Sequence, residues 1–223
     1  MKKIFLFVAI AILFLQFSVQ KAETVKYRIK KKTSEIHGQV FSEVEYFYDL
    51  KGRILTQIEG PDTMRFIYDH DTVWQKGKYT GLPTMEVKYV LNSAGLAVTD
   101  NLKKVYMYDE NNFLISSIYP NGNFISHTIS DGDIISTTFA LQGRQVIDCT
   151  FYPDPDNSDL GQGFLGNQNT HLVKMEVVTR DDNTDTLKYT YKFDKLGRVA
   201  KSTYVRQPSP GIFDTTTVSY SYY

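Results

Sequence analysis

The chain of 223 residues has one cysteine, one tryptophan and no excess of either charge. A single cysteine, Cys149, cannot form an internal disulfide bond. The 25 basic and 25 acidic residues cancel, which argues against nucleic-acid binding, because that function needs a basic surface. Helical periodicity is nearly absent beyond the N-terminal segment. The sequence is therefore predicted to form β-structure.

The motifs of enzyme and metal chemistry are also missing. The sequence has no Gly-x-Ser-x-Gly elbow and no His-Glu-x-x-His pattern. No histidine has a His or Cys partner at the spacing of a zinc site; the histidines are His37, His70, His127 and His171. Cys149 lies in an apolar run, which would raise its pKa and leave the thiol inert. We predict no enzymatic activity, no catalytic residue, no metal and no cofactor.

Two acidic segments, Asp154–Asp159 and Asp181–Asp185, carry the oxygen donors that Ca²⁺ prefers. Neither matches the calcium loop of an EF-hand, because Asp159 and Thr186 stand where that loop needs glycine, and the final acidic ligand is missing. Asp and Asn also stabilise tight turns by bonding to nearby backbone. We interpret both segments as turns.

The only long apolar run is at the start. Met1-Lys2-Lys3 precedes the apolar residues 4–17, which are too few for a membrane helix of about 20 residues and fit a secretory signal. We place cleavage near residues 20–22. The prediction is a signal peptide over 1–22 and a single all-β domain over 23–223. Export would place the protein in the periplasm or outside the cell, with outer-membrane association as an alternative.

The most informative stretch is Tyr46–Leu55. Val44, Tyr46 and Tyr48 alternate with Glu45 and Phe47, the period of a strand with one buried face. The segment 49–52 then offers an aspartate for backbone hydrogen bonds and a glycine for positive φ. Alternation resumes from Ile54. This stretch predicts a β-hairpin.

The hairpin pattern recurs along the chain with a spacing of roughly 20 residues in its first half. The further copies are Arg65–Asp69, Lys88–Leu96, Tyr106–Leu114, His127–Ile135 and Tyr189–Val199, with Cys149–Tyr152 opening one that runs into a long loop and 216–223 as a closing strand. Each strand is predicted to bury its aromatic side. The fold class is therefore all-β, an antiparallel up-and-down meander that forms a strongly curved sheet or a closed or half-open barrel.

The motif Tyr-x-Tyr-Asp-x-x-Gly-Arg resembles the YD repeats of bacterial RHS-type surface and toxin-delivery proteins. The clearest matches are Tyr46–Ile54 and Tyr189–Val199, with Tyr106–Leu114 degenerate. The order of an export signal, degenerate hairpins, a polar loop over 166–173 and a final strong copy is similar to a family of uncharacterised secreted bacterial domains with a porin-like fold. The resemblance implies a fold and contributes no catalytic residues.

Alternation by itself fits both a soluble barrel and an outer-membrane barrel. Return strands of about 5–7 residues are shorter than the 9–11 of a membrane strand, and the tyrosines fall in strand middles, so we predict that the chain does not span the membrane after signal cleavage. The expected function is a non-enzymatic interaction or structural domain of the cell envelope. The expected contact regions are the polar face and the loop Asp154–Asn169, with a glycan or protein as partner.

Two alternatives remain, an outer-membrane β-barrel and a module that binds a glycan or a lipid. For the binding module, Trp74 is the candidate ligand-binding residue, because an indole ring offers a stacking surface for a sugar. It would line a concave pocket together with several tyrosines.

Overall fold

A computed structural model describes residues 26–141, 143–156, 158–181, 183–209 and 212–223. Within them the chain is all-β with one short 3₁₀ helix, η1 (Gly163–Leu165), as predicted. The predicted signal peptide lies outside the described residues. The described part contains no helix with the length and apolarity of a membrane span.

The strands follow one another along the chain with short connections. They are β1 (Tyr27–Ile36), β2 (Gln39–Tyr48), β3 (Ile54–Glu59), β4 (Asp62–Asp69), β5 (Thr72–Lys78), β6 (Met85–Leu91), β7 (Ala97–Asp100), β8 (Val105–Tyr108), β9 (Leu114–Ile118), β10 (Phe124–Ser130), β11 (Asp133–Leu141), β12 (Gly143–Pro155), β13 (Ser158–Asp159), β14 (His171–Arg180), β15 (Asn183–Phe193), β16 (Val199–Ser209) and β17 (Ile212–Tyr222).

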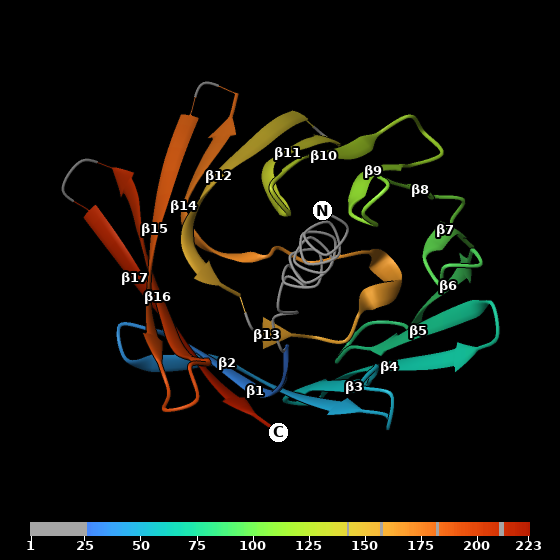
Figure 1. The fold of residues 1–223 in the computed structure, drawn as a ribbon, viewed down its shortest axis with the longest axis horizontal. Helices are drawn as coiled ribbons and strands as arrows, with labels where there is room; N and C mark the ends of the chain where they lie inside the picture. Colours follow the sequence, from blue (N-terminus) through green and yellow to red (C-terminus); the bar gives the residue numbers. More distant parts are fainter. Residues whose placement is uncertain (1–25, 142, 157, 182, 210–211) are drawn as a thin grey trace, which may run out of the picture.

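All strands except β13 form the wall of a 16-strand antiparallel barrel (Figure 1). Each pairs with the next along the chain, and β12 pairs with β14 across the intervening loop. The last strand closes the ring, since β17 pairs with β1 over Ile36↔Thr216 to Ile29↔Tyr222. Of the predicted forms, a strongly curved sheet or a closed or half-open barrel, the chain adopts the closed barrel, which leaves no free edge.

Turns of one kind lie at one end of the barrel, which we call the plugged end. In the turn after β2, the Asp49 carboxylate accepts hydrogen bonds from the backbone N–H of Lys51 and Arg53, both at 2.9 Å, and Gly52 has φ +75°. Asn92, Asp109 and Asp194 make the same bonds in their turns. The repeated aspartate therefore acts in the turn, as predicted.

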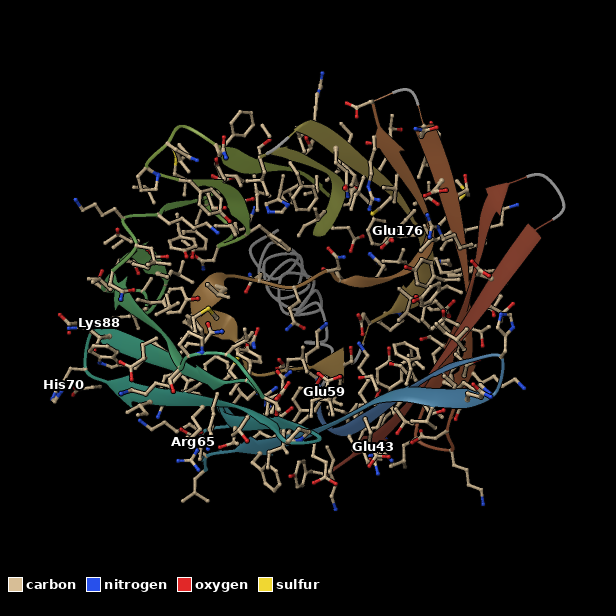
Figure 2. The ribbon with its side chains drawn as sticks, turned by 180° about the vertical axis from the view of Figure 1, so that it is seen from behind. Glu43, Glu59, Arg65, His70, Lys88 and Glu176 are labelled. Carbon is tan, nitrogen blue, oxygen red and sulfur yellow. The ribbon has the colours of Figure 1, made fainter. Side chains whose placement is uncertain are left out.

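The inner face of the barrel is aromatic, and the outer face carries charged residues together with exposed apolar side chains such as Phe47, Ile67 and Met107. Val44 and Tyr46 of β2 are buried, whereas Glu43 and Glu45 face outward; Glu43, Arg65 and Lys88 lie on the outside in Figure 2. One burial prediction is wrong. Phe193, which the alternation places on the buried side with Tyr189 and Tyr191, is 46% exposed at the end of its strand.

Strand length differs from the expectation on one side of the ring. β7 and β8 have 4 residues and β9 has 5, but β14 to β17 have 10 or 11. The expected 5–7 residues of the return strands hold for β3 and β9, with 6 and 5 residues, and are wrong for β16, with 11. On this side of the barrel the strands continue through Thr and Lys residues. These residues lie outside the aromatic motif, so the motif did not predict the full strand length.

Candidate functional site: the plug and two cavities at one end of the barrel

A loop between β12 and β14 enters the barrel instead of remaining on its surface. Residues 156–170, which we call the plug, cross the interior and return to the wall (Figure 1). At the base, Asp156 N–H donates to the Thr170 carbonyl at 2.9 Å. A barrel of 16 strands is wide enough to leave an open lumen unless something fills it. Here the plug and the inward aromatic side chains of the wall occupy that space.

The plug is fastened to three turns of the plugged end by backbone hydrogen bonds. Ile54 N–H donates to the Gly161 carbonyl at 3.3 Å, Asn167 N–H to the Asn112 carbonyl at 2.9 Å, and Thr170 N–H to the Gly132 carbonyl at 3.0 Å. The acceptors and donors on the wall belong to the turns after β2, β8 and β10. The hairpin turns thus position the plug.

Two plug glycines are required by this close approach. Gly161 has φ +65°, and a Cβ there would lie 2.5 Å from the Gly52 carbonyl oxygen. Gly166 has φ +101°, and a Cβ there would lie 2.8 Å from the Asn112 carbonyl oxygen. Any larger residue would push the plug away from the turns.

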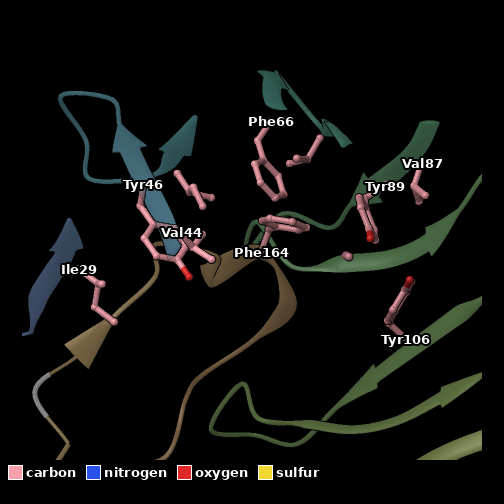
Figure 3. Close-up of a cluster of buried hydrophobic side chains, with 11 residues drawn as sticks. Ile29, Val44, Tyr46, Phe66, Val87, Tyr89, Tyr106 and Phe164 are labelled. Atoms are coloured by element: carbon pink, nitrogen blue, oxygen red, sulfur yellow. The ribbon is translucent and has the colours of Figure 1, made fainter. Parts of the chain in front are cut away.

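Phe164 holds the plug to the aromatic interior. Its side chain is 6% exposed, and its ring lies 5.2 Å from Tyr89 and 6.2 Å from Phe66, centroid to centroid (Figure 3). The same ring meets Tyr68 edge-on at 6.3 Å. Such pairs add to the stabilisation from burial, so the plug shares the hydrophobic core of the wall.

Charged groups fasten the start of the plug to β1. Arg28 forms an ion pair with Asp159 and donates from Nε to the Gly52 carbonyl at 2.6 Å. The Lys26 ammonium donates to the Asp156 and Asn169 carbonyls. Burial lowers the pKa of Lys26, against the opposing attraction of Asp156 and Asp133.

The end of the plug is fastened by Asp133, a carboxylate that is 4% exposed. It accepts hydrogen bonds from the Thr170 and His171 backbone N–H at 2.8 and 2.9 Å, and its other oxygen lies 2.7 Å from His171 Nδ1. Three hydrogen bonds account for its burial. Sequence reasoning missed this residue, because Asp133 looked like another turn aspartate in a weak hairpin copy.

The plug and the turns line an open cavity of about 630 Å³, which we call the basic cavity. Four cationic residues and one carboxylate line it, together with the polar run 167–170, four glycines and Phe113. The cations are Lys26, Arg28, Lys51 and Arg53, and the carboxylate is Asp159. The size is in the range of small-molecule sites.

A second cavity of about 670 Å³ lies on the other side of residues 167–170, and we call it the acidic cavity. Asp109, Asp131 and His171 are among its lining residues, and Phe113, Asn167 and Thr170 line both cavities. The plug thus separates a basic from an acidic space. No cluster of three or more His, Cys, Asp or Glu residues with metal-binding geometry occurs in the described residues.

The sequence candidates lie elsewhere. Trp74 is on the outer face of β5, paired with Ile67 and Lys88 across the sheet, and the Lys88 and Lys76 ammonium groups lie 5.2 and 5.3 Å from its ring. It lines neither cavity. The role of Trp74 as a ligand-binding residue therefore stays a prediction. The polar run 167–170 and the plug glycines are the sequence features that line the basic cavity.

Cys149 lies in the wall near Glu176. Burial, and then the Glu176 and Asp148 charges, raise the pKa of its thiol to about 11. Glu176 points inward (Figure 2) and accepts a hydrogen bond from the Tyr189 hydroxyl at 3.0 Å. The thiol is therefore protonated at neutral pH, as its apolar setting predicted.

Comparison with solved structures gives the fold. A porin-like protein from Bacteroides uniformis ATCC 8492 superposes with a TM-score of 0.62 at 18% identity, over 87% of this chain and 98% of that chain. The fold is porin-like. A porin-like protein from Bacteroides vulgatus ATCC 8482 gives a TM-score of 0.57 at 13% identity, over 89% of this chain and 99% of that one.

No family model and no curated protein matches the sequence. The resemblance to YD repeats therefore stays a prediction, whereas the expected porin-like fold is confirmed. At these identities the likeness concerns the porin-like barrel and not its activity.

Proposed function

We propose that this protein is an exported, non-enzymatic component of the cell envelope that binds a partner through the plugged end of its barrel. The observation that carries the proposal is the plug itself. A 15-residue segment is folded into the lumen and held by three turns, and it forms two cavities of opposite charge. Such an arrangement places polar groups on a rigid frame, which is what a binding site needs.

The outer wall supports a barrel that faces water. Lys31 and Glu43 pair at 2.7 Å on the outer face of the long strands β1 and β2, and Lys76 and Glu86 pair at 3.0 Å on β5 and β6. A lysine facing lipid at mid-membrane costs about 2–4 kcal/mol. On the opposite side, strands of 4 residues are far below the 9–11 of a membrane strand.

The described part of the chain supports a role without catalysis. The Cys149 thiol has a pKa of about 11 and carries no thiolate at neutral pH. His171, the histidine beside the acidic cavity, is engaged with the buried Asp133 carboxylate. Both side chains have a structural task that accounts for them.

One observation favours the second candidate, an outer-membrane barrel. The strands β14 to β17 have 10 or 11 residues, enough to cross a bilayer, and the structural neighbours are described as porin-like. The two candidates differ in what the outer face contacts, which fractionation measures directly.

The first experiment fractionates cells that express the full chain with a short C-terminal tag. We expect a processed protein that leaves with the soluble envelope fraction or the medium and needs no detergent. Recovery only from outer membrane after detergent extraction would establish the membrane barrel instead.

The second experiment tests the plugged end. The released protein is assayed for binding to immobilised envelope polysaccharides and surface proteins, with Gly161→Ala as the plug variant and Gly81→Ala as its matched control. Gly81 also has positive φ, a Cβ on it meets no atom within 4 Å, and it lines neither cavity. Loss of binding in the Gly161 variant alone is expected, and equal binding by both variants would place the binding surface elsewhere.

A further inference from the structure

We infer that the basic cavity binds a carboxylate-bearing sugar of the uronic-acid class. This inference rests on the proposed function and names a ligand for the plugged end. It is carried by the composition of the cavity, in which cations from β1 and the first repeat turn face neutral amide side chains of the plug.

The cations are held in place before any ligand arrives. Arg28 uses Nε for the Gly52 carbonyl and Nη1 for Asp159. Arg53 uses Nε and Nη2 for the Asp49 carboxylate, at 2.7 and 2.6 Å, and its guanidinium stacks 4.1 Å from the Tyr68 ring centre. Because an arginine side chain carries five N–H donors, each guanidinium keeps a terminal nitrogen that makes no hydrogen bond within the described residues.

The Arg28 guanidinium reaches the first repeat turn at Gly52. A Cβ on this residue would lie 2.7 Å from Arg28 Nη2, so the free nitrogen of Arg28 lies directly above the turn that carries Lys51 and Arg53. Lys51 is exposed, and its ammonium makes no hydrogen bond or ion pair to another described residue. Arg28, Lys51 and Arg53 all line the basic cavity, and positive groups that line one cavity suit a carboxylate.

The opposite wall of the cavity suits hydroxyl groups. Asn167, Gln168, Asn169 and Thr170 all line it and carry no charge. Asn169 and Thr170 are partly engaged, with Asn169 Oδ1 accepting from Ile134 N–H at 2.8 Å and Thr170 Oγ1 donating to the Gly132 carbonyl at 2.9 Å. Gln168 makes no side-chain hydrogen bond among the described residues and retains both its amide donors and its acceptor.

Charge and shape select the ligand class. A neutral sugar would offer the guanidinium nitrogens only hydroxyl acceptors without the negative charge that strengthens such bonds, and inorganic phosphate would fill only a small part of about 630 Å³. A uronic acid satisfies both walls, since its carboxylate faces the cations and its hydroxyls face the amides. The acidic cavity beyond residues 167–170 disfavours extension of the ligand's negative charge to that side.

The test is calorimetric titration and thermal shift on the purified, processed protein with galacturonate and glucuronate, compared with galactose, glucose and inorganic phosphate. At ten times Kd, the uronates are expected to raise Tm by about 3–6 °C, and the affinity is expected to fall as salt rises. Equal binding of the neutral sugars or of phosphate would overturn the inference, as would the absence of any shift with either uronate. The affinity for galacturonate trimers is compared with that for the monomer. Tighter binding of the trimer would indicate a polysaccharide end as the natural source, and equal binding a free sugar acid.

Two variants locate the site. Lys51→Glu is expected to weaken uronate binding about tenfold and Gln168→Ala about threefold, both with unchanged Tm in the absence of ligand. Lys195→Glu is the control, because Lys195 is an exposed turn lysine in the equivalent hairpin and lines neither cavity. Unchanged affinity in Lys51→Glu, or an equal loss in Lys195→Glu, would overturn the assignment.

The uronate titrations and the tests of the proposed function can fail independently. If the plugged end binds an envelope component that is lost in Gly161→Ala while the uronates fail, the ligand class is wrong and the function stands. If the protein is recovered only from outer membrane yet binds uronates with loss in Lys51→Glu, the site stands and the water-facing barrel is wrong.

Discussion

At the scale of single residues, the repeated aspartate stabilises the turns. Its carboxylate accepts hydrogen bonds from backbone N–H groups that a neighbouring strand would otherwise satisfy. Asp49 and Asp194 each accept two backbone N–H groups and a side-chain bond from an arginine four residues on. Asn92 makes the backbone bonds without the charge. Each turn therefore requires a side-chain oxygen that accepts the backbone hydrogen bonds. In Asp49 and Asp194 the carboxylate also accepts a hydrogen bond from an arginine.

This arrangement predicts a pH dependence of stability. Desolvation pushes the pKa of both carboxyls upward, but the hydrogen bonds from Arg53 or Arg198 and the attraction of their charges outweigh it, so that each pKa lies below its ordinary 3.8. As the pH falls below 3.8, the unfolded chain binds protons first. The stabilisation is thus complete above that pH and is lost as the pH falls through the folded-state pKa.

The measurement is Tm against pH from about 5 to 2 for the wild type and for the double variant Asp49→Asn/Asp194→Asn. Asparagine keeps the acceptor and removes the titration, so we expect a shallower decline in the variant. Identical slopes would mean that these two carboxyls do not contribute to acid unfolding.

The Gly161→Ala variant tests the contact between plug and turn. Positive φ and a Cβ only 2.5 Å from the Gly52 carbonyl oxygen predict a loss of about 2–3 kcal/mol in the free energy of unfolding. Gly163→Ala, where a Cβ meets open space, is expected to change stability by less than about 1 kcal/mol. Urea denaturation of both variants is the measurement, and equal stabilities would contradict the described contact.

At the scale of elements, the barrel is a repeated hairpin that one exceptional connection completes. The plug is the long loop that replaces a short turn between β12 and β14, and it brings Phe164 from outside the wall into the wall's own core. Its backbone polar groups are satisfied by the turns it reaches. Wall and plug are therefore stabilised by one shared set of contacts.

The variant Phe164→Ala tests how much the packing of the plug into the core of the wall stabilises the protein. Removal of a ring that is 6% exposed is expected to cost about 3–5 kcal/mol and to raise hydrogen exchange in residues 158–170 while the wall strands stay protected. Phe193→Ala is the matched control, because Phe193 is 46% exposed and its truncation should cost less than about 1 kcal/mol. Equal costs would show that the plug is not part of the core.

At the scale of the whole molecule, tyrosine is the main component of the interior. Tyr46, Tyr89 and Tyr106 are buried in the core cluster, and hydroxyls elsewhere bond to backbone carbonyls, as from Tyr48 to Ile29 at 2.6 Å and Tyr191 to Val173 at 2.8 Å. Tyrosine fills a wide ring because its apolar body packs against neighbours while its hydroxyl satisfies the polar wall.

An interior rich in buried tyrosine predicts that the folded state loses stability at high pH. Burial is the largest cause that raises the pKa of Tyr46, Tyr68, Tyr89 and Tyr108, each to about 12. The folded state thus keeps its phenols neutral where the unfolded state ionises, near pH 10. Stability is full below the unfolded pKa and is lost as pH rises toward 12.

The measurement is tyrosine ionisation by absorbance near 295 nm alongside circular dichroism. We expect most phenols to ionise together with unfolding, in one step above about pH 11, and the urea-unfolded chain to titrate near pH 10. Gradual ionisation in the folded state, centred near pH 10, would contradict a tyrosine-filled interior.

The sequence by itself determined the hairpins, the aromatic inner face and the turn aspartates. These properties depend on residues within about 10 positions of one another, and the alternation at Tyr46 or the Asp49 turn expresses them locally. It also marked the polar loop as exceptional, by length and composition.

Only the tertiary structure decided that the sheet closes, that the loop folds inward and that Trp74 faces out. Closure joins β1 to β17 across almost the whole chain, and the plug contacts turns that lie between 30 and 110 residues away. The pairing of β12 with β14 likewise leaves the intervening residues free to enter the barrel. Register and long-range pairing set these outcomes, because a shift of one residue exchanges the two faces of a strand without changing its pattern.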